Sequence, residues 1–130
     1  MSYPVHFETQ SAHRLELLGR HRQPSDQLLH LRAGSLLMRL GRDEFVLRQG
    51  DLFWLPADCL HGLTLWQGCQ FNRIRFSVRV RGERPRAAGY LHHHPLLMPL
   101  LERLERQLAA APLDWQGHSG RLSRLLADLL

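Results

Sequence analysis

Two histidines of this sequence stand in settings that a binding or catalytic site could use. His61 follows a proline-containing turn between apolar segments, and His21 lies in a polar stretch typical of a loop. An inward-facing histidine can ligate a metal, hydrogen-bond to a ligand hydroxyl or satisfy a buried carbonyl group. The residues alone leave these roles open for His61, and for His21 they also leave a solvated surface position.

The other residues that could react or hold a metal are arranged less favourably. The three histidines at 92–94 are adjacent, and consecutive residues of an extended chain point to alternate sides, so they cannot close around one ion. Cys59 and Cys69 form neither a zinc-ribbon spacing nor a disulfide framework. We expect a polar connection at 92–94 and reduced thiols at both cysteines, with Cys59 buried as a small apolar side chain.

The positive charge of the chain is concentrated in residues 73–86. All 17 basic residues are arginines, the net charge is +5, and this segment sets six arginines against Glu83 alone. Within 72–80 the even positions from Ile74 onward are apolar and the odd positions polar, which predicts a strand whose basic side faces away from the core. A solvated strand face is the favoured interpretation, and contact with phosphates or with an acidic partner is the alternative.

A β-structure over the first two thirds of the chain must position these residues. Between Arg14 and Val80 the apolar residues recur mostly at every second position between turn residues, which predicts a meander of short antiparallel strands. We expect a hairpin over 36–48, an apolar strand over 52–55 and a strand over 72–80.

The last third of the chain has the apolar spacing of helices. Leucines at helical intervals predict helices over 96–111 and 119–130, the second capped by Ser119. The predicted fold class is therefore mainly β with two C-terminal helices. Because the second leucine stripe reaches residue 130 without a stop signal, we expect the parent protein to continue beyond it.

Size and composition indicate one soluble domain. The chain has 130 residues, of which 44% are hydrophobic and 22% charged, as in ordinary globular proteins. No stretch reaches the roughly 18 consecutive apolar residues that a membrane span needs, and the first 13 residues contain no apolar signal core. We expect a cytoplasmic protein without a membrane partner.

The segment from Gly50 to His61 resembles the second conserved motif of the cupin superfamily, in which a glycine, five residues, a proline and a turn precede a histidine on the next strand. Asp58 stands where that family usually has glycine. The resemblance assigns the superfamily's metal ligands to His21, Gln23, Gln27 and His61. Only the two histidines match, and neutral amides are poor ligands for transition metals, so we expect no metal and no other cofactor.

A cupin-like β-barrel followed by two leucine-striped helices resembles the N-terminal effector-binding and dimerisation domain of AraC-type transcriptional regulators. The resemblance implies one sensing domain over 1–130, with an N-terminal arm at 1–12, the barrel at 13–81 and dimerisation helices at 95–130. It also implies a homodimer and a small-molecule effector. DNA would be bound only through a helix-turn-helix domain beyond residue 130.

The candidate residues follow from this resemblance. Tryptophan can stack on a sugar ring or a planar effector, although it is more often part of a core. We expect the effector pocket to be lined by His21, His30, Met38, Trp54 and His61. We expect the dimer to be held by Leu97, Leu101, Leu104, Leu108, Leu122, Leu125, Leu126 and Leu129.

Two rival functions are consistent with parts of the sequence. A stand-alone metal-dependent cupin enzyme, such as a dioxygenase or a sugar isomerase, suits the fold but not the ligand set. Direct binding of nucleic acid through the arginines at 73–86 suits the charge. However, that segment lacks the interleaved aromatic residues and glycines of sheet-type RNA binders. A regulatory binding module without enzymatic activity is therefore the favoured function.

Overall fold

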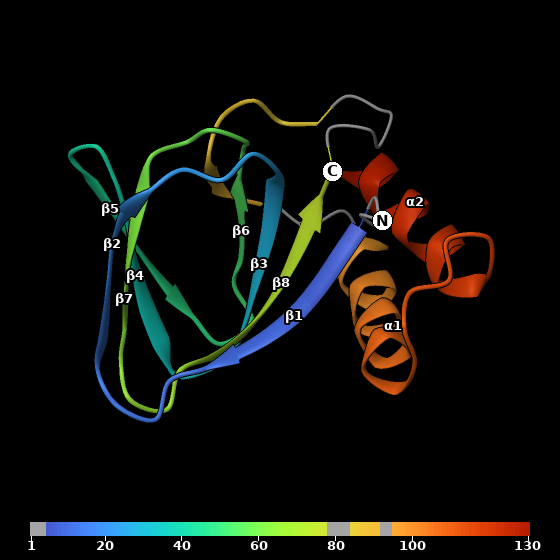
Figure 1. Ribbon diagram of the computed structural model, residues 1–130, viewed down its shortest axis with the longest axis horizontal. Helices are drawn as coiled ribbons and strands as arrows, with labels where there is room; N and C mark the ends of the chain where they lie inside the picture. Colours follow the sequence, from blue (N-terminus) through green and yellow to red (C-terminus); the bar gives the residue numbers. More distant parts are fainter. Residues whose placement is uncertain (1–4, 78–83, 92–94) are drawn as a thin grey trace.

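The computed structural model describes residues 5–77, 84–91 and 95–130. Within these ranges two antiparallel sheets pack face to face, and two helices cover the outer face of one of them (Figure 1). Sheet A has the strand order β1-β8-β3-β6-β9, and sheet B has the order β2-β7-β4-β5. The elements are β1 (Val5–Ser11), β2 (Glu16–His21), β3 (Asp26–Ala33), β4 (Ser35–Leu40), β5 (Asp43–Arg48), β6 (Leu52–Leu55), β7 (His61–Leu65), β8 (Gln70–Phe76), β9 (Gly89–Tyr90), α1 (Leu97–Ala110) and α2 (His118–Leu129).

The predicted class, mainly β with two C-terminal helices, is confirmed. The expected hairpin is β4 and β5, which turn at Gly41 with a φ of 58°, and the expected apolar strand is β6. The helices begin and end within one residue of the expected bounds. The strand expected over 72–80 is observed as β8, ending at Phe76, and residues 78–80 lie outside the described ranges.

The N-terminal segment differs from the expectation. Residues 5–11 are not a separate arm, because they form β1, which pairs with β8 from Val5 opposite Phe76 to Ser11 opposite Gln70. The sheet also extends past residue 81, since β9 pairs with β6. The helix cap differs too: α2 begins after Gly117, and the buried Ser119 hydroxyl accepts a hydrogen bond from the Asp114 N–H at 2.9 Å.

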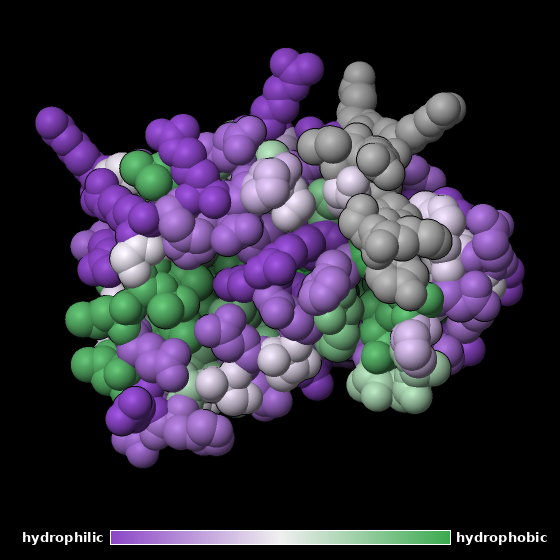
Figure 2. Space-filling model, viewed as in Figure 1, coloured by the Kyte–Doolittle hydropathy of each residue, from purple (hydrophilic) through white to green (hydrophobic). Residues whose placement is uncertain are grey.

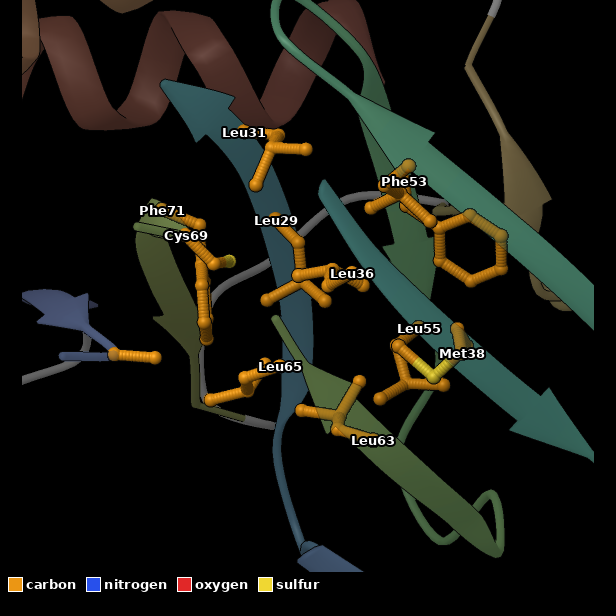
Figure 3. Close-up of a cluster of buried hydrophobic side chains, with 12 residues drawn as sticks. Leu29, Leu31, Leu36, Met38, Phe53, Leu55, Leu63, Leu65, Cys69 and Phe71 are labelled. Carbon is orange, nitrogen blue, oxygen red and sulfur yellow. The ribbon is translucent and has the colours of Figure 1, made fainter. Parts of the chain in front are cut away.

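A barrel core fills the space between the two sheets (Figure 3). Successive residues of a strand point to opposite faces, so β3, β6 and β8 of sheet A send alternate side chains into this core. The buried members are Ala12, Leu29, Leu31, Leu36, Met38, Leu47, Phe53, Leu55, Leu63, Leu65, Cys69 and Phe71.

A second core, the helix-side core, lies between sheet A and the helices. The central strand β6 is therefore apolar on both faces, which explains why all four of its residues are buried. The buried members are Val5, Leu28, Leu52, Trp54, Ile74, Phe76, Leu97, Leu101, Leu104, Leu126 and Ala127.

The helix-side core corrects the expected dimer surface. Four of the eight expected interface leucines are buried against the chain's own sheet, because the outer face of sheet A is itself apolar and covers both helical stripes. These four are Leu97, Leu101, Leu104 and Leu126. Three others, Leu108, Leu122 and Leu129, pack partly against the same core, whereas Leu125 is 48% exposed.

The outer face of sheet B carries exposed apolar side chains. Leu17 and Val46 lie in one cross-strand row, linked through Thr64 and Leu37, and hydrophobic surface shows on this side of the molecule, at the left of Figure 2. Among the described helices, none is long and apolar enough to cross a membrane.

Candidate functional site

The polar side chains inside the barrel are fixed by strand register. In β3 and β8, Leu29 lies opposite Arg73, and Gln27 lies opposite Arg75. Partners across an antiparallel ladder share a face of the sheet, and Leu29 belongs to the barrel core. Gln27, Arg73 and Arg75 therefore point toward the barrel interior as well.

This placement overturns the expectation that the basic residues of 72–80 face away from the core. The Arg73 side chain is only 10% exposed. Ile74 and Phe76 of β8 are apolar because they face the helices, so the odd positions are left to face the barrel. Arg79 lies outside the described residues.

The other sheet and β1 complete a cluster of polar residues at one end of the barrel core. His61 begins β7, with the same parity as the core residues Leu63 and Leu65, and it pairs with His21 of β2. The two imidazole rings have centroids 4.4 Å apart. We call the following set the barrel-mouth cluster: Glu8, His21, Gln27, His61, Arg73 and Arg75.

Glu8 lies between the two arginines of the cluster. Its Oε1 accepts a hydrogen bond from Nη1 of Arg73 and forms an ion pair with Nη2 of Arg75, each at 3.0 Å. Burial lowers the pKa of the Arg73 guanidinium, and the Glu8 carboxylate partly offsets that effect. Two cations thus share one carboxylate.

Three donors of the cluster are buried without a hydrogen-bond partner among the described residues. They are Nε2 of Gln27, Nε of Arg73 and Nε of Arg75. A buried donor that lacks an acceptor costs about 1–3 kcal/mol. All three lie on the same face of neighbouring strands, so one acceptor group placed among them could satisfy several at once.

His61 is held as a neutral hydrogen-bonding group. Burial lowers its pKa, the Cys59 carbonyl raises it through a hydrogen bond, and the nearby His21 and Arg73 lower it further. Its Nδ1 lies 3.0 Å from that carbonyl oxygen. A neutral His61 therefore donates from Nδ1 and keeps Nε2 as an acceptor.

The barrel-mouth cluster fits a metal ion poorly. Among the described residues no group of three His, Cys, Asp or Glu side chains could hold one. The charged side chain that acts on His61 at close range is the cationic Arg73 rather than a carboxylate. Burial raises the pKa of Cys69 to about 11 and raises that of the half-buried Cys59, which disfavours the thiolate form that binds metals.

The turn before His61 takes the form that the motif requires. Asp58 has a φ of 61°, a left-handed conformation that usually favours glycine and that aspartate tolerates better than most residues. The turn is tied to the start of β3, because the Ala57 N–H donates to Oδ1 of Asp26 at 2.8 Å.

The family model described as the AraC-like ligand binding domain matches residues 4–130. The chain belongs to this family. It functions as the ligand-sensing part of a regulator, as the resemblance of the sequence implied.

Solved structures agree with this fold. ToxT K231A from Vibrio cholerae superposes with a TM-score of 0.70 at 5% identity, over 96% of this chain and 53% of that one. A cupin superfamily protein from Desulfitobacterium hafniense gives 0.55 at 17% identity, over 59% of this chain and 71% of that one. A Streptococcus pyogenes protein of unknown function gives 0.54 at 17% identity, over 67% and 70%. The cupin-like barrel is thus confirmed, and no curated protein matches the sequence.

Within this AraC-like domain the five expected pocket residues do not lie together. His21 and His61 meet at the barrel mouth, and Met38 is buried deeper in the barrel core. His30 and Trp54 point the other way, because even positions of β3 and β6 face the helices. The Trp54 indole donates to the Pro85 carbonyl at 2.7 Å.

His30 belongs to a buried polar network that joins sheet A to α1. Its Nδ1 lies 2.6 Å from Oε1 of Glu105, and Nδ2 of Asn72 donates to the other carboxylate oxygen. The Thr9 hydroxyl donates to Asn72 at 2.7 Å. A cavity of about 400 Å³ opens beside this network, lined by Phe7, Thr9, Arg32, Gln70, Asn72, Glu102, Glu105, Arg106 and Ala109.

The sequence interpretation of this AraC-like domain missed three residues of the barrel-mouth cluster. Glu8 was assigned to an arm, and Arg73 and Arg75 to a solvated face. The signal that could have located Arg73 is the strand register. When β3 and β8 are paired so that Leu29 faces the barrel core, Arg73 lies opposite Leu29 and must face the barrel too. That signal depends on knowing that helices cover the opposite face.

Proposed function

We propose that this domain binds its small-molecule effector at the barrel-mouth cluster and that it acts by binding alone, without catalysis. The observation that carries this proposal is the set of three buried, unpartnered donors beside His21 and His61. Binding sites combine a few convergent polar groups with an apolar wall, and here the barrel core supplies that wall.

A cupin enzyme is the second candidate, and the chemistry of the cluster disfavours it. Metal catalysis needs an ion held by about three protein ligands with one position open. The cluster offers two imidazoles, and a divalent cation would lie close to Arg73. We therefore propose a metal-free sensor that contains no cofactor.

We further propose that the sensor works as a homodimer in the cytoplasm and that DNA is bound by another domain, outside residues 1–130. The dimer surface is the outer side of α2, where Leu125 remains exposed, together with Leu96 at the start of α1, which is 59% exposed. Pairing of these leucines would remove apolar area from water.

The effector would influence the helices through β8 and β1. Arg73 faces the barrel mouth, whereas its neighbour Asn72 bonds Glu105 on α1. On β1, Glu8 faces the mouth and Thr9 bonds Asn72. A ligand shifts such a linkage only if it binds one arrangement of strands and helices more tightly than another.

A thermal-shift screen of residues 1–130 against a library of small metabolites tests the proposed site. We expect at least one compound to raise the melting temperature of the wild type, and to lose that effect in His61→Ala. His13→Ala is the matched control, because His13 is exposed. Hits that act equally on both variants would place the effector site elsewhere, and the absence of hits would argue against sensing.

A further inference from the structure

The barrel-mouth cluster has an excess of positive charge. Arg73 and Arg75 contribute two cations, Glu8 one anion, and His61 is neutral, so these four side chains carry a net charge of +1. Arg84, the next described arginine along the chain, is paired with Asp26 at 2.7 Å. One further negative charge would neutralise the cluster.

The unpartnered donors lie on one face of sheet A and suit an anion. Glu8 occupies terminal nitrogens of both guanidinium groups, and this leaves both Nε–H groups buried and unbonded. Gln27 is 1% exposed, lies opposite Arg75 and presents a third unbonded N–H. An ionised carboxylate has two oxygens that accept about four hydrogen bonds in total, and such charge-assisted bonds are among the strongest in proteins.

The surroundings define the rest of the ligand. Leu29, Leu55 and Leu63 fill the barrel core next to the cluster, so the body of the ligand must extend toward the two histidines. There Nε2 of His61 is an acceptor, which suits a ligand hydroxyl group. A phosphate dianion would leave the cluster with a net negative charge in a buried position, which is costly.

We infer that the effector is a small hydroxycarboxylate, whose carboxylate binds between Arg73, Arg75 and Gln27 and whose hydroxyl group bonds to His61. This inference rests on the proposed function, because it names the chemical class that the sensing site would take.

The experiment measures binding of lactate, gluconate and salicylate to residues 1–130 by calorimetry and thermal shift. Lactamide and salicylamide serve as uncharged analogues, and inorganic phosphate as a second anion. We expect at least one carboxylate to bind, with its amide weaker by tenfold or more, as for the loss of a charged hydrogen bond. An amide that binds equally well, or phosphate that binds more tightly than every carboxylate, would overturn the carboxylate class.

Two variants with opposite expected effects on binding distinguish a lost ligand contact from a misfolded protein. Arg73→Gln should weaken carboxylate binding at least tenfold. Glu8→Gln should tighten it several-fold, because it removes the anion that competes for both guanidinium groups. Arg42→Gln, on the exposed turn between β4 and β5, is the matched control. A merely structural role for these residues would predict loss of binding in both variants, and that result would overturn the inference.

The outcomes also separate this inference from the proposed function. If a neutral compound binds and His61→Ala abolishes its binding, the domain is a sensor but not of carboxylates. If none of the carboxylates binds and the three donors are satisfied by water alone, the carboxylate inference fails. The metabolite screen then decides separately whether any effector is bound.

Discussion

At the scale of single residues, His61 couples the stability of the domain to pH. Its pKa in the folded state is lowered, chiefly by burial, whereas in the unfolded chain it returns to about 6.5. The unfolded state therefore binds the proton more readily than the folded state. The contribution of His61 to stability is fully present above the unfolded-state pKa, and it is lost as the pH falls toward the folded-state pKa.

We expect urea unfolding of residues 1–130 to show stability rising with pH through this window. His61→Gln should flatten the rise, because glutamine does not titrate, and His13→Ala should leave it unchanged because that side chain is exposed. A slope that is the same in all three proteins would assign the titration to other groups.

Glu105 supports a second prediction at this scale. Its carboxylate is buried and accepts bonds from His30 and Asn72, so Glu105→Ala leaves both partners unsatisfied and should cost about 3 kcal/mol of unfolding free energy. Glu102→Ala on the same helix should cost under about 0.5 kcal/mol, because Glu102 is exposed. Chemical denaturation of the two variants checks the difference, and equal losses would contradict the buried network.

The roles of single site residues were harder to predict from the sequence than the presence of the motif that ends at His61. His61 was found because the glycine, proline and histidine of its motif are local in sequence. Glu8 and Arg73 were not, because their contact joins residues 65 positions apart. Only the pairing of β1 with β8 brings them together.

At the scale of elements, α1 and α2 differ in what their leucines do. Leu104 is fully buried in the helix-side core, so Leu104→Ala should cost about 3 kcal/mol, and Leu104→Asp should unfold the domain rather than dissociate it. Leu125→Asp should instead give a folded monomer. Sedimentation velocity with circular dichroism distinguishes these results. If Leu125→Asp remains dimeric, the apolar outer face of sheet B becomes the stronger candidate for the interface.

The start of α2 gives a further prediction. Gly120 packs so closely on the Trp115 carbonyl that an added Cβ would overlap it. Gly120→Ala should therefore destabilise the domain by about 1–3 kcal/mol, although alanine favours helices. Gly19→Ala is the control, because nothing lies near its Cβ position, and it should be close to neutral. A neutral Gly120→Ala would mean that this helix start relaxes freely.

The elements themselves were predictable because periodicity is a local property. The 36–48 hairpin, β6 and both helices lie where the apolar spacing predicts them. The orientation of β8 was not predictable in this way, since apolar even positions indicate a buried face without saying which core buries it.

At the scale of the whole molecule, the net charge of +5 predicts how the isolated domain meets DNA. We expect weak binding without sequence preference that disappears near about 150 mM salt, because released counterions drive it. The N-terminus of α1, Leu97-Met98-Pro99, offers no base-reading side chains. A gel shift that persists at that salt and discriminates a promoter from scrambled DNA would contradict the proposal that another domain binds DNA.

The double covering of sheet A has a consequence for how such a domain can change. Arg73 and Asn72 are adjacent, yet one faces the barrel mouth and the other the helices. With the effector site and the linkage that we propose, we expect substitutions at odd positions of β8 to change ligand binding and substitutions at even positions to change the contact with the helices. An insertion or deletion of one residue in β8 would turn the side chains that face the barrel toward the helices, and the reverse. We therefore expect length changes to be tolerated in the turn at Gly41 but not in this strand.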